Sequence, residues 1–293
     1  MIGLADRLRH GLIPAVPVPF RGGVLAEAAQ REYARWMAAQ PVAGVAVWAH
    51  TGRGPRLSAD QRRVVLETWR EAMPDRPIIA GAHDITTAIE ARRGHADALL
   101  LFPVHNDPVA HHDRLSRELP GIAFWLYEAA GGVPYDDGTL HAILSLPRII
   151  GIKVATLDSV MTFQRIAGIM RDHPDKLLIT GEDRFLGYSL LMGAEAALIG
   201  MGAALPAMQA SLLAARRNAD WATFIQRSAE CDRFAAATFR EPMEGYIRRM
   251  LWAAAADGAI PEDACDDPWG PPLAAEERDA VQRAVVDAHA TRA

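Results

Sequence analysis

The chain alternates short apolar runs with longer stretches in which apolar residues recur every three or four positions. Short continuous apolar runs are typical of strands buried on both faces, whereas the longer period is typical of amphipathic helices. Eight such runs follow one another at spacings of roughly 20 to 35 residues: Ile13–Val18, Gly44–Trp48, Pro77–Ala80, Ala98–Phe102, Ile122–Tyr127, Ile149–Lys153, Leu177–Thr180 and Ala196–Ile199. The pattern therefore predicts eight strands, each followed by a helix.

Capping residues mark where several of these helices begin. Ser58 stands three residues before Gln61, a spacing that lets the two side chains cap the first turn of a helix over Ala59–Met73. In the same way, Asp158 is expected to cap a helix over Ser159–Asp172.

Eight alternations of strand and helix favour a closed (β/α)8 TIM barrel over residues 1–210. A doubly wound open sheet is the alternative. That fold usually has fewer strands and a glycine-rich phosphate turn after the first one. The residues after the first run, from Pro19 to Gly23, do not match that turn.

The pattern changes after about Pro206. Residues 207–257 read as continuously helical, 258–273 as loop, and 274–290 as a final helix. We therefore expect a second region, 211–293, that forms a C-terminal helical extension packed on the barrel.

Composition narrows the classes of protein. The chain is 50% apolar and 23% charged with a formal net charge of −5, and it has no long run of one sign. This argues against binding to nucleic acid. Its two cysteines, Cys231 and Cys265, provide no disulfide framework. The charged N-terminus lacks the apolar core of a signal peptide, and no stretch is long enough to cross a membrane, so we expect a cytoplasmic protein.

Lys153 is the first candidate for chemistry, because barrel enzymes place reacting groups at the C-terminal ends of strands. It ends its apolar run and is one of two lysines in a chain rich in arginine. Burial there would lower the pKa of the amine and make it nucleophilic. The structural alternative is a lysine that extends along the rim of the barrel towards water.

Tyr127 ends the preceding run, so the two side chains should lie over the same end of the barrel. A hydroxyl beside a Schiff base can transfer protons. The alternative is an aromatic residue of the core.

The second run ends in a turn that starts at His50-Thr51-Gly52. Glycines at 52 and 54 allow a tight turn that exposes N–H groups. With the Thr51 hydroxyl, such a turn can hold a carboxylate, although an ordinary connecting loop would look the same.

Taken together, these motifs resemble the dihydrodipicolinate synthase / N-acetylneuraminate lyase superfamily over residues 11–210. The resemblance rests on the order and spacing of Pro17-Val-Pro-Phe20, His50-Thr51-Gly52, Pro103-Val-His-Asn106, Tyr127, Gly151-Ile-Lys153 and Gly181-Glu-Asp183. The sequence of residues 51–58 is most similar to that of the 2-keto-3-deoxygluconate aldolase branch.

The resemblance implies a role for each matched residue. Lys153 would form the Schiff base with a 2-oxo acid, and Tyr127 would relay the proton. His50, Thr51 and Gly52, together with Gly181 and Leu198, would bind the substrate. The family needs no metal or organic cofactor, and a homodimer or homotetramer is expected.

Several positions depart from the family pattern. His50 replaces a threonine or serine, Arg53 replaces the usual glutamate, and Glu128 begins a segment that replaces Asn-x-Pro. Gly132 stands where the lysine-pathway synthase has an arginine for its second substrate, which argues against that activity. His105 stands where the family often has a tyrosine that reaches a neighbouring subunit, and we assign it as a third catalytic candidate.

Other polar pairs are weaker candidates. His83-Asp84 follows the third run, where Asp84 is expected to cap a helix and His83 could bind a substrate hydroxyl. Glu182-Asp183 could in principle bind a divalent cation, but no companion ligands are evident, and we predict no metal site.

Three functions are compatible with these residues. The first is a Schiff-base aldolase or lyase acting on pyruvate or a 2-keto-3-deoxy sugar acid. The second is an imine-forming dehydratase, hydratase or decarboxylase of a sugar acid or specialised metabolite. The third is a barrel that binds a small metabolite without converting it.

Overall fold

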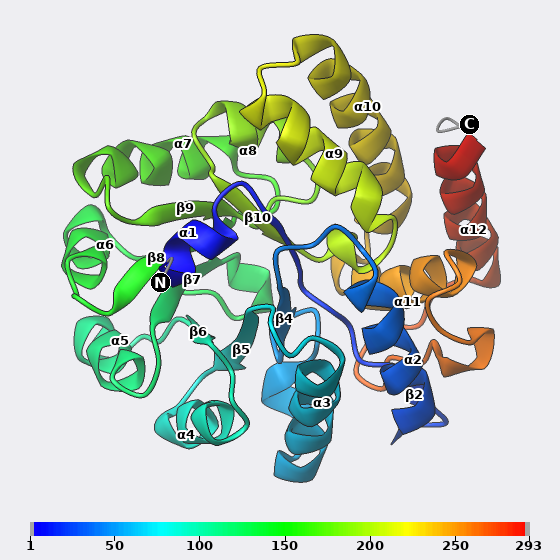
Figure 1. The fold of residues 1–293 in the computed structure, drawn as a ribbon, viewed down its shortest axis with the longest axis horizontal. Helices are drawn as coiled ribbons and strands as arrows, with labels where there is room; N and C mark the ends of the chain where they lie inside the picture. The colour runs from blue at the N-terminus through cyan, green and yellow to red at the C-terminus, as the bar shows by residue number, and fades with distance from the viewer. Residues whose placement is uncertain (1–2, 291–293) are drawn as a thin grey trace.

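The structure, a computed structural model, describes residues 3–290. Eight parallel strands form a barrel with helices outside it (Figure 1). The strands are β1 (Leu12–Pro14), β4 (Val45–Val47), β5 (Ile78–Ala82), β6 (Ala98–Leu101), β7 (Gly121–Leu126), β8 (Ile149–Ala155), β9 (Leu177–Thr180) and β10 (Ala196–Ile199). Their order around the sheet is β1-β10-β9-β8-β7-β6-β5-β4.

The barrel closes between its first two strands. Ala15 pairs in parallel with Ala46, and the Val16 N–H donates to the Ala46 carbonyl at 3.1 Å. The predicted (β/α)8 fold is therefore confirmed, and the open-sheet alternative is wrong.

Helices connect the strands and cover their outer face. They are α1 (Leu4–Leu8), α2 (Glu27–Ala38), α3 (Ala59–Ala72), α4 (Ile85–Arg93), α5 (Pro108–Ser116), α6 (Asp137–Leu144), α7 (Val160–Ile169), α8 (Leu186–Leu191), α9 (Pro206–Arg217), α10 (Trp221–Thr238), α11 (Tyr246–Ala256) and α12 (Ala275–Ala290). A small hairpin of β2 (Phe20–Arg21) and β3 (Val24–Leu25) precedes α2.

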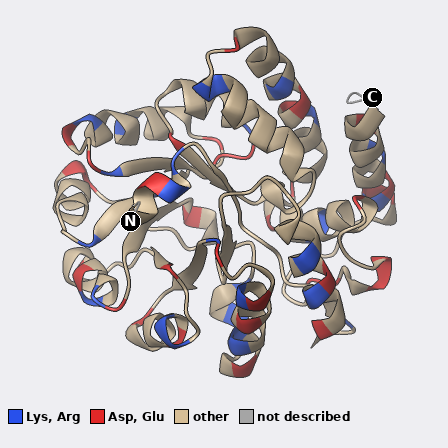
Figure 2. Ribbon diagram, viewed as in Figure 1, with Lys and Arg blue, Asp and Glu red and all other residues tan. Residues whose placement is uncertain are grey.

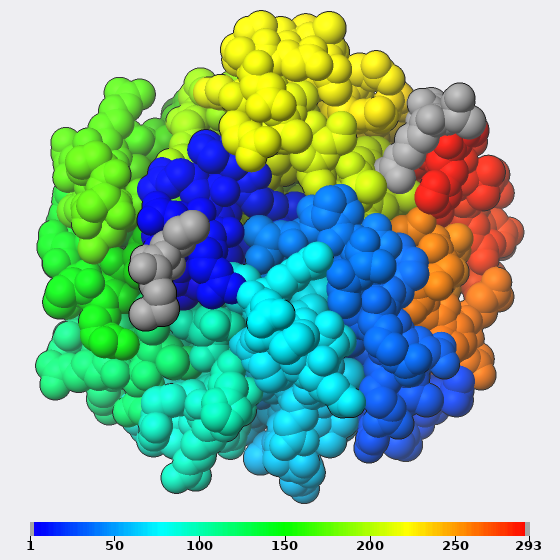
Figure 3. Space-filling view, in the orientation of Figure 1, coloured from blue at the N-terminus to red at the C-terminus, as the bar shows by residue number. Residues whose placement is uncertain are grey.

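Alternating side chains divide the core into two layers, because successive residues of a strand point to opposite faces. Ile13, Ile79, Leu100, Ile122 and Leu198 belong to the layer that fills the barrel. Leu4, Ala5 and Leu8 of α1 pack on this layer. Figures 1 and 3 show α1, in the darkest blue, left of the centre on the face turned to the viewer. Helix α1 thus covers the N-terminal end of the barrel and leaves the opposite end for a site.

Local signals predicted some helix ends correctly. Ser58 accepts the N–H of Gln61 at 3.2 Å, and Gln61 accepts the N–H of Ser58 at 2.9 Å, so the expected capping box is present. Asp84 likewise caps α4. The expected cap at Asp158 is wrong, because the Ser159 hydroxyl accepts the Thr162 N–H instead.

The predicted continuous helix over 207–257 is also wrong. It is divided into α9, α10 and α11, with breaks at residues 218–220 and 239–245. Asp220 starts α10 by accepting the N–H of Thr223 at 3.1 Å, which favours a new helix over continuation of the old one. Because α9 runs across residue 210, the exact division between barrel and extension remains a prediction.

Charged side chains are distributed over the outer helices without separation of sign (Figure 2). Among the described residues, no helix is long and apolar enough to cross a membrane.

Candidate active site

Lys153 lies inside the C-terminal end of the barrel. Its neighbours in β8, Ile152 and Val154, point to the outer core, so Lys153 points inward. The side chain is 5% exposed, and its Nζ lies 4.2 Å from the centre of the Phe124 ring. In the described part of the chain this nitrogen makes no hydrogen bond or ion pair, which leaves it available to a ligand.

Burial sets the charge state of this amine. It lowers the pKa of Lys153 to about 8, against the opposing attraction of Asp183 and Glu182. Burial also raises the pKa of Asp183, although this carboxylate accepts the Met201 N–H at 2.7 Å. A lysine with this pKa is neutral in a useful fraction near pH 7, as a nucleophile requires.

Gly181 provides the space that the lysine occupies. A Cβ at this position would lie 2.6 Å from Lys153 Cε and 2.9 Å from Ala155 Cβ. Such distances are well below ordinary carbon–carbon contact. Gly181 therefore acts here by fitting against the lysine stem.

The turn after β4 is tightly folded. Arg53 has a left-handed backbone with φ of 52°, and a Cβ on Gly54 would lie 1.8 Å from the Trp48 carbonyl oxygen. The N–H groups of Arg53 and Gly54 are used within the turn. Those of Thr51 and Gly52 make no hydrogen bond among the described residues, so they are the ones available to an anion.

Glu244 joins this turn to Tyr127. It lies just before α11, and its Oε1 accepts the Tyr127 hydroxyl at 2.8 Å and interacts with His50 Nε2 at 2.9 Å. Its Oε2 accepts Arg53 Nη1 at 2.8 Å. Arg53 also donates to both carboxylate oxygens of Asp267, at 3.1 and 2.7 Å. The charge reversal at Arg53 is thus matched by two carboxylates of the C-terminal extension.

These contacts perturb the groups involved. Burial alone would raise the pKa of Glu244, but the hydrogen bond and charge of His50, with hydrogen bonds from Tyr127 and Arg53, lower it to about 2. Burial, the neighbouring Tyr246 and the negative charge of Glu244 raise the pKa of Tyr127. The carboxyl is therefore ionised and the phenol protonated.

A second contact from the extension reaches Thr51. Its hydroxyl lies 2.9 Å from the Tyr246 hydroxyl, and both side chains are buried. The Tyr246 ring stacks on Phe239, with ring centres 4.8 Å apart. Helix α11 thus places a second tyrosine beside the turn after β4.

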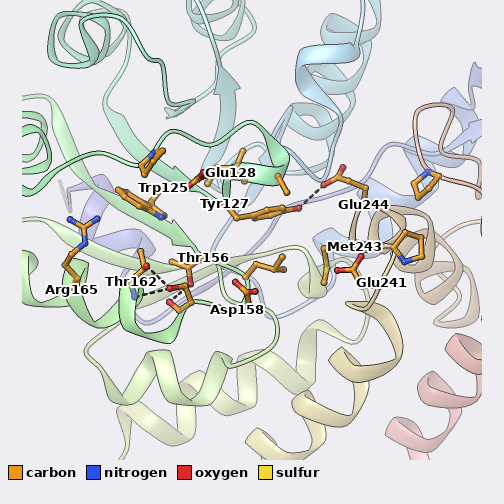
Figure 4. A pocket seen from close by; sticks show the side chains of 17 residues that line it. Trp125, Tyr127, Glu128, Thr156, Asp158, Thr162, Arg165, Glu241, Met243 and Glu244 are labelled. Carbon is orange, nitrogen blue, oxygen red and sulfur yellow. Dashed lines mark hydrogen bonds between the residues drawn. The ribbon is translucent and has the colours of Figure 1, made fainter.

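Two adjacent cavities lie beside these residues. The inner one, of about 30 Å³, contains Lys153, Tyr127, Thr51, Gly181 and Tyr246 in its lining. The outer one, of about 740 Å³, shares Leu126, Tyr127 and Leu157 with it. Figure 4 shows the outer cavity with Tyr127 and Glu244 on one side and Trp125 and Arg165 further along. A ligand can therefore place one end at Lys153 and extend into a wider chamber.

Not all predicted site residues come together. Lys153, Tyr127, His50, Thr51 and Gly181 line the inner cavity. Gly52 supports the turn without lining the cavity, and Leu198 is packed in the barrel interior. His105 is exposed in the loop after β6 and lines neither cavity in this single chain.

Glu244, Tyr246 and Asp267 were not predicted from the sequence. They lie in the extension, more than a hundred residues from Tyr127 along the chain. The one signal in the sequence was Arg53, an arginine in the turn after β4 that needs an acidic partner once it is buried. Among residues 3–290, no group of three or more acidic, histidine or cysteine side chains is arranged to hold a metal ion.

The geometry defines a class of protein, the (β/α)8 barrels with a lysine buried at the C-terminal end of a strand. Comparison with known proteins gives the family. The model of the dihydrodipicolinate synthetase family matches residues 8–288, so the chain belongs to this family.

Two relatives of this chain are 4-hydroxy-tetrahydrodipicolinate synthases with moderate sequence identity to it. The 4-hydroxy-tetrahydrodipicolinate synthase of Nitrobacter hamburgensis is 30% identical over 249 residues, which cover 80% of this chain and 82% of the relative. The enzyme of the same name from Rhodopseudomonas palustris is 27% identical over 247 residues, which cover 80% and 82%.

Solved structures agree in fold. A monomeric dihydrodipicolinate synthase variant superposes with a TM-score of 0.86 at 18% identity, over 99% of each chain. The sialic acid aldolase of Ruminococcus gnavus superposes with a TM-score of 0.85 at 17% identity, over 98% of this chain and 99% of the aldolase.

Proposed function

We propose that the chain is a Schiff-base aldolase or lyase that acts on a 2-oxo acid, such as pyruvate or a 2-keto-3-deoxy sugar acid. The observation that carries this proposal is the Lys153 amine, which is buried, free of hydrogen bonds within the described residues, and exposed to a cavity. Family membership supports it, and a variant of the Ruminococcus gnavus aldolase is described as a catalytic lysine mutant.

In the proposed reaction the neutral Lys153 amine attacks the C2 carbonyl of the 2-oxo acid. Loss of water from the resulting carbinolamine gives the iminium ion. Removal of a proton from C3 then gives an enamine, which adds to an aldehyde; the reverse sequence releases one. Tyr127 relays protons, and Thr51 with the free N–H groups of its turn binds the carboxylate of the substrate.

The site does not favour the 4-hydroxy-tetrahydrodipicolinate synthase activity for which the relatives described above are named. A Cβ at Gly132 would lie 1.7 Å from the Leu126 carbonyl oxygen, so an arginine cannot be accommodated there without moving the backbone. The outer cavity is lined by Glu128, Asp158 and Glu241, none of which is in an ion pair within the described chain. Arg165, its one lining cation, is paired with Asp137. We therefore propose an aldehyde partner without a second carboxylate.

We also propose that the protein works in the cytoplasm as a homodimer or homotetramer. Both cysteines are buried and neither is part of a disulfide, which suits a reducing compartment. The loop carrying His105 is exposed, so a neighbouring copy is the route by which this histidine would reach a site.

Release of pyruvate from a panel of 2-keto-3-deoxy sugar acids tests the reaction. We expect release with the wild type and none with Lys153→Ala, while Lys176→Ala retains it. Loss of water without release of pyruvate would instead support the dehydratase alternative. Thermal stabilisation by these acids that is equal in Lys153→Ala and unaccompanied by turnover would support a binding protein.

A further inference from the structure

Glu244 occupies an unusual position for a residue of the C-terminal extension. It belongs to the short turn Met243–Gly245 before α11, yet its carboxylate contacts three residues from the C-terminal ends of β4 and β7. Its side chain is 34% exposed, and it lines the outer cavity next to Tyr127, as Figure 4 shows. The contacts thus connect the extension directly to the proposed proton relay.

We propose that Glu244 is a positioning residue that acts through Tyr127 as the acceptor of its phenolic proton. This inference rests on the proposed function. Glu244 Oε1 accepts the Tyr127 O–H at 2.8 Å, so the phenolic hydrogen points to the extension. The lone pairs of the phenolic oxygen are then left to accept a proton from the substrate.

The proton transfer balances without a further reactant. When the iminium ion loses a proton from C3, the C–H electron pair forms the C2–C3 double bond and the nitrogen takes the electrons of the iminium bond. The C3 proton goes to the Tyr127 oxygen while the phenolic proton goes to Glu244. Glu244 holds the proton only transiently, because its contacts with His50 and Arg53 favour the ionised carboxylate. The proton then passes to water, to which this side chain is 34% exposed, or returns through the phenol.

The neighbours of Glu244 explain why this carboxylate can stay in place. Arg53 holds Oε2 at 2.8 Å and is itself fixed by both oxygens of Asp267, whose side chain is 1% exposed. His50 Nε2 contacts the same Oε1 as Tyr127. The histidine and arginine that replace the family's usual residues in this turn therefore form, with Glu244, one set of contacts around the tyrosine.

The exchange of the pyruvate methyl protons in D2O, followed by NMR, measures removal of the C3 proton without an aldehyde. We expect Glu244→Gln to slow exchange by about 100-fold, at the lower end of the range for loss of one proton-transfer group, because Tyr127 itself remains. Trapping of the imine at Lys153 by borohydride should persist. Glu244→Asp, which keeps the charge, should exchange faster than Glu244→Gln. The matched control is Glu262→Gln, a glutamate of the same extension that is 70% exposed and pairs with Arg278.

The double variant distinguishes action through Tyr127 from a general structural effect. If Glu244 acts through Tyr127, then Tyr127→Phe/Glu244→Gln exchanges no more than about twofold slower than Tyr127→Phe alone. Losses that multiply in the double variant, or wild-type exchange in Glu244→Gln, overturn the role of Glu244. If wild-type protein shows neither a trapped imine nor exchange with any 2-oxo acid, the proposed function fails, and this inference fails with it.

Discussion

Replacement of Gly181 by alanine tests whether the position of the Lys153 amine controls activity. The added methyl group would lie 2.6 Å from Lys153 Cε, whereas carbon atoms in contact are about 3.5–4.0 Å apart. The lysine stem or its strand must therefore shift by about 1 Å. A misplacement of that size costs about 100-fold in rate, and overpacking of the core costs about 1–3 kcal/mol of stability.

The assay is the rate of imine formation with pyruvate, measured by borohydride quench at successive times. Gly168→Ala is the matched control, because Gly168 lies in α7 with no atom within 4 Å of an added Cβ. Its rate should equal that of the wild type, and its stability should be equal or higher. Wild-type imine formation in a folded Gly181→Ala protein would refute the argument that this glycine makes room for the lysine.

Three further predictions concern charge in the site. The rate of imine formation should rise about tenfold per pH unit up to about pH 8 and then level off, because burial lowers the pKa of Lys153 to about 8 and only the neutral amine attacks; a rate independent of pH between 6 and 8 would contradict this. Lys153→Met should raise the free energy of unfolding at pH 7 by about 1–3 kcal/mol in urea titrations. Because the lysine binds its proton more tightly in the unfolded chain, its burial lowers the stability of the folded protein at pH 7, and this penalty diminishes between about pH 8 and 10.5. A loss of stability in Lys153→Met would contradict this reasoning. Arg53→Lys should lower the free energy of unfolding by about 2–3 kcal/mol, since a lysine cannot bond both Glu244 and Asp267 in forked geometry. Arg21→Lys, at an exposed ion pair with Asp263, should leave the free energy of unfolding nearly unchanged. Equal effects of the two substitutions would argue against the buried network.

The sequence was sufficient for the barrel because each strand is a short apolar run bounded by a turn or a helix cap. Leu177–Thr180 and Ala196–Ile199 are strands over the residues expected. Lys153 and Tyr127 were predictable for the same reason. Lys153 lies two residues before the end of β8 and Tyr127 directly follows β7, so both lie towards one end of the barrel.

The extension could not be predicted in the same way. Its contacts with the site join Glu244 and Tyr246 to residues near positions 50 and 127, and no local pattern records such distant pairs. Apolar periodicity also continued across the breaks at 218–220 and 239–245, where Asp220 caps the start of α10 and Pro242 lies between α10 and α11. His105 and Leu198 were assigned through resemblance alone, and in a single chain neither lines the cavity.

Reduction of the protein with borohydride in the presence of pyruvate, followed by peptide mass mapping, tests the central proposal most directly. Only two lysines are present, and the Nζ of Lys176 already donates to the Ile149 carbonyl at 2.8 Å, so it serves as an internal control. We predict the mass of reduced pyruvate on the peptide containing Lys153 and none on that containing Lys176. Modification of both lysines alike, or of neither with any 2-oxo acid, would contradict a Schiff base at Lys153.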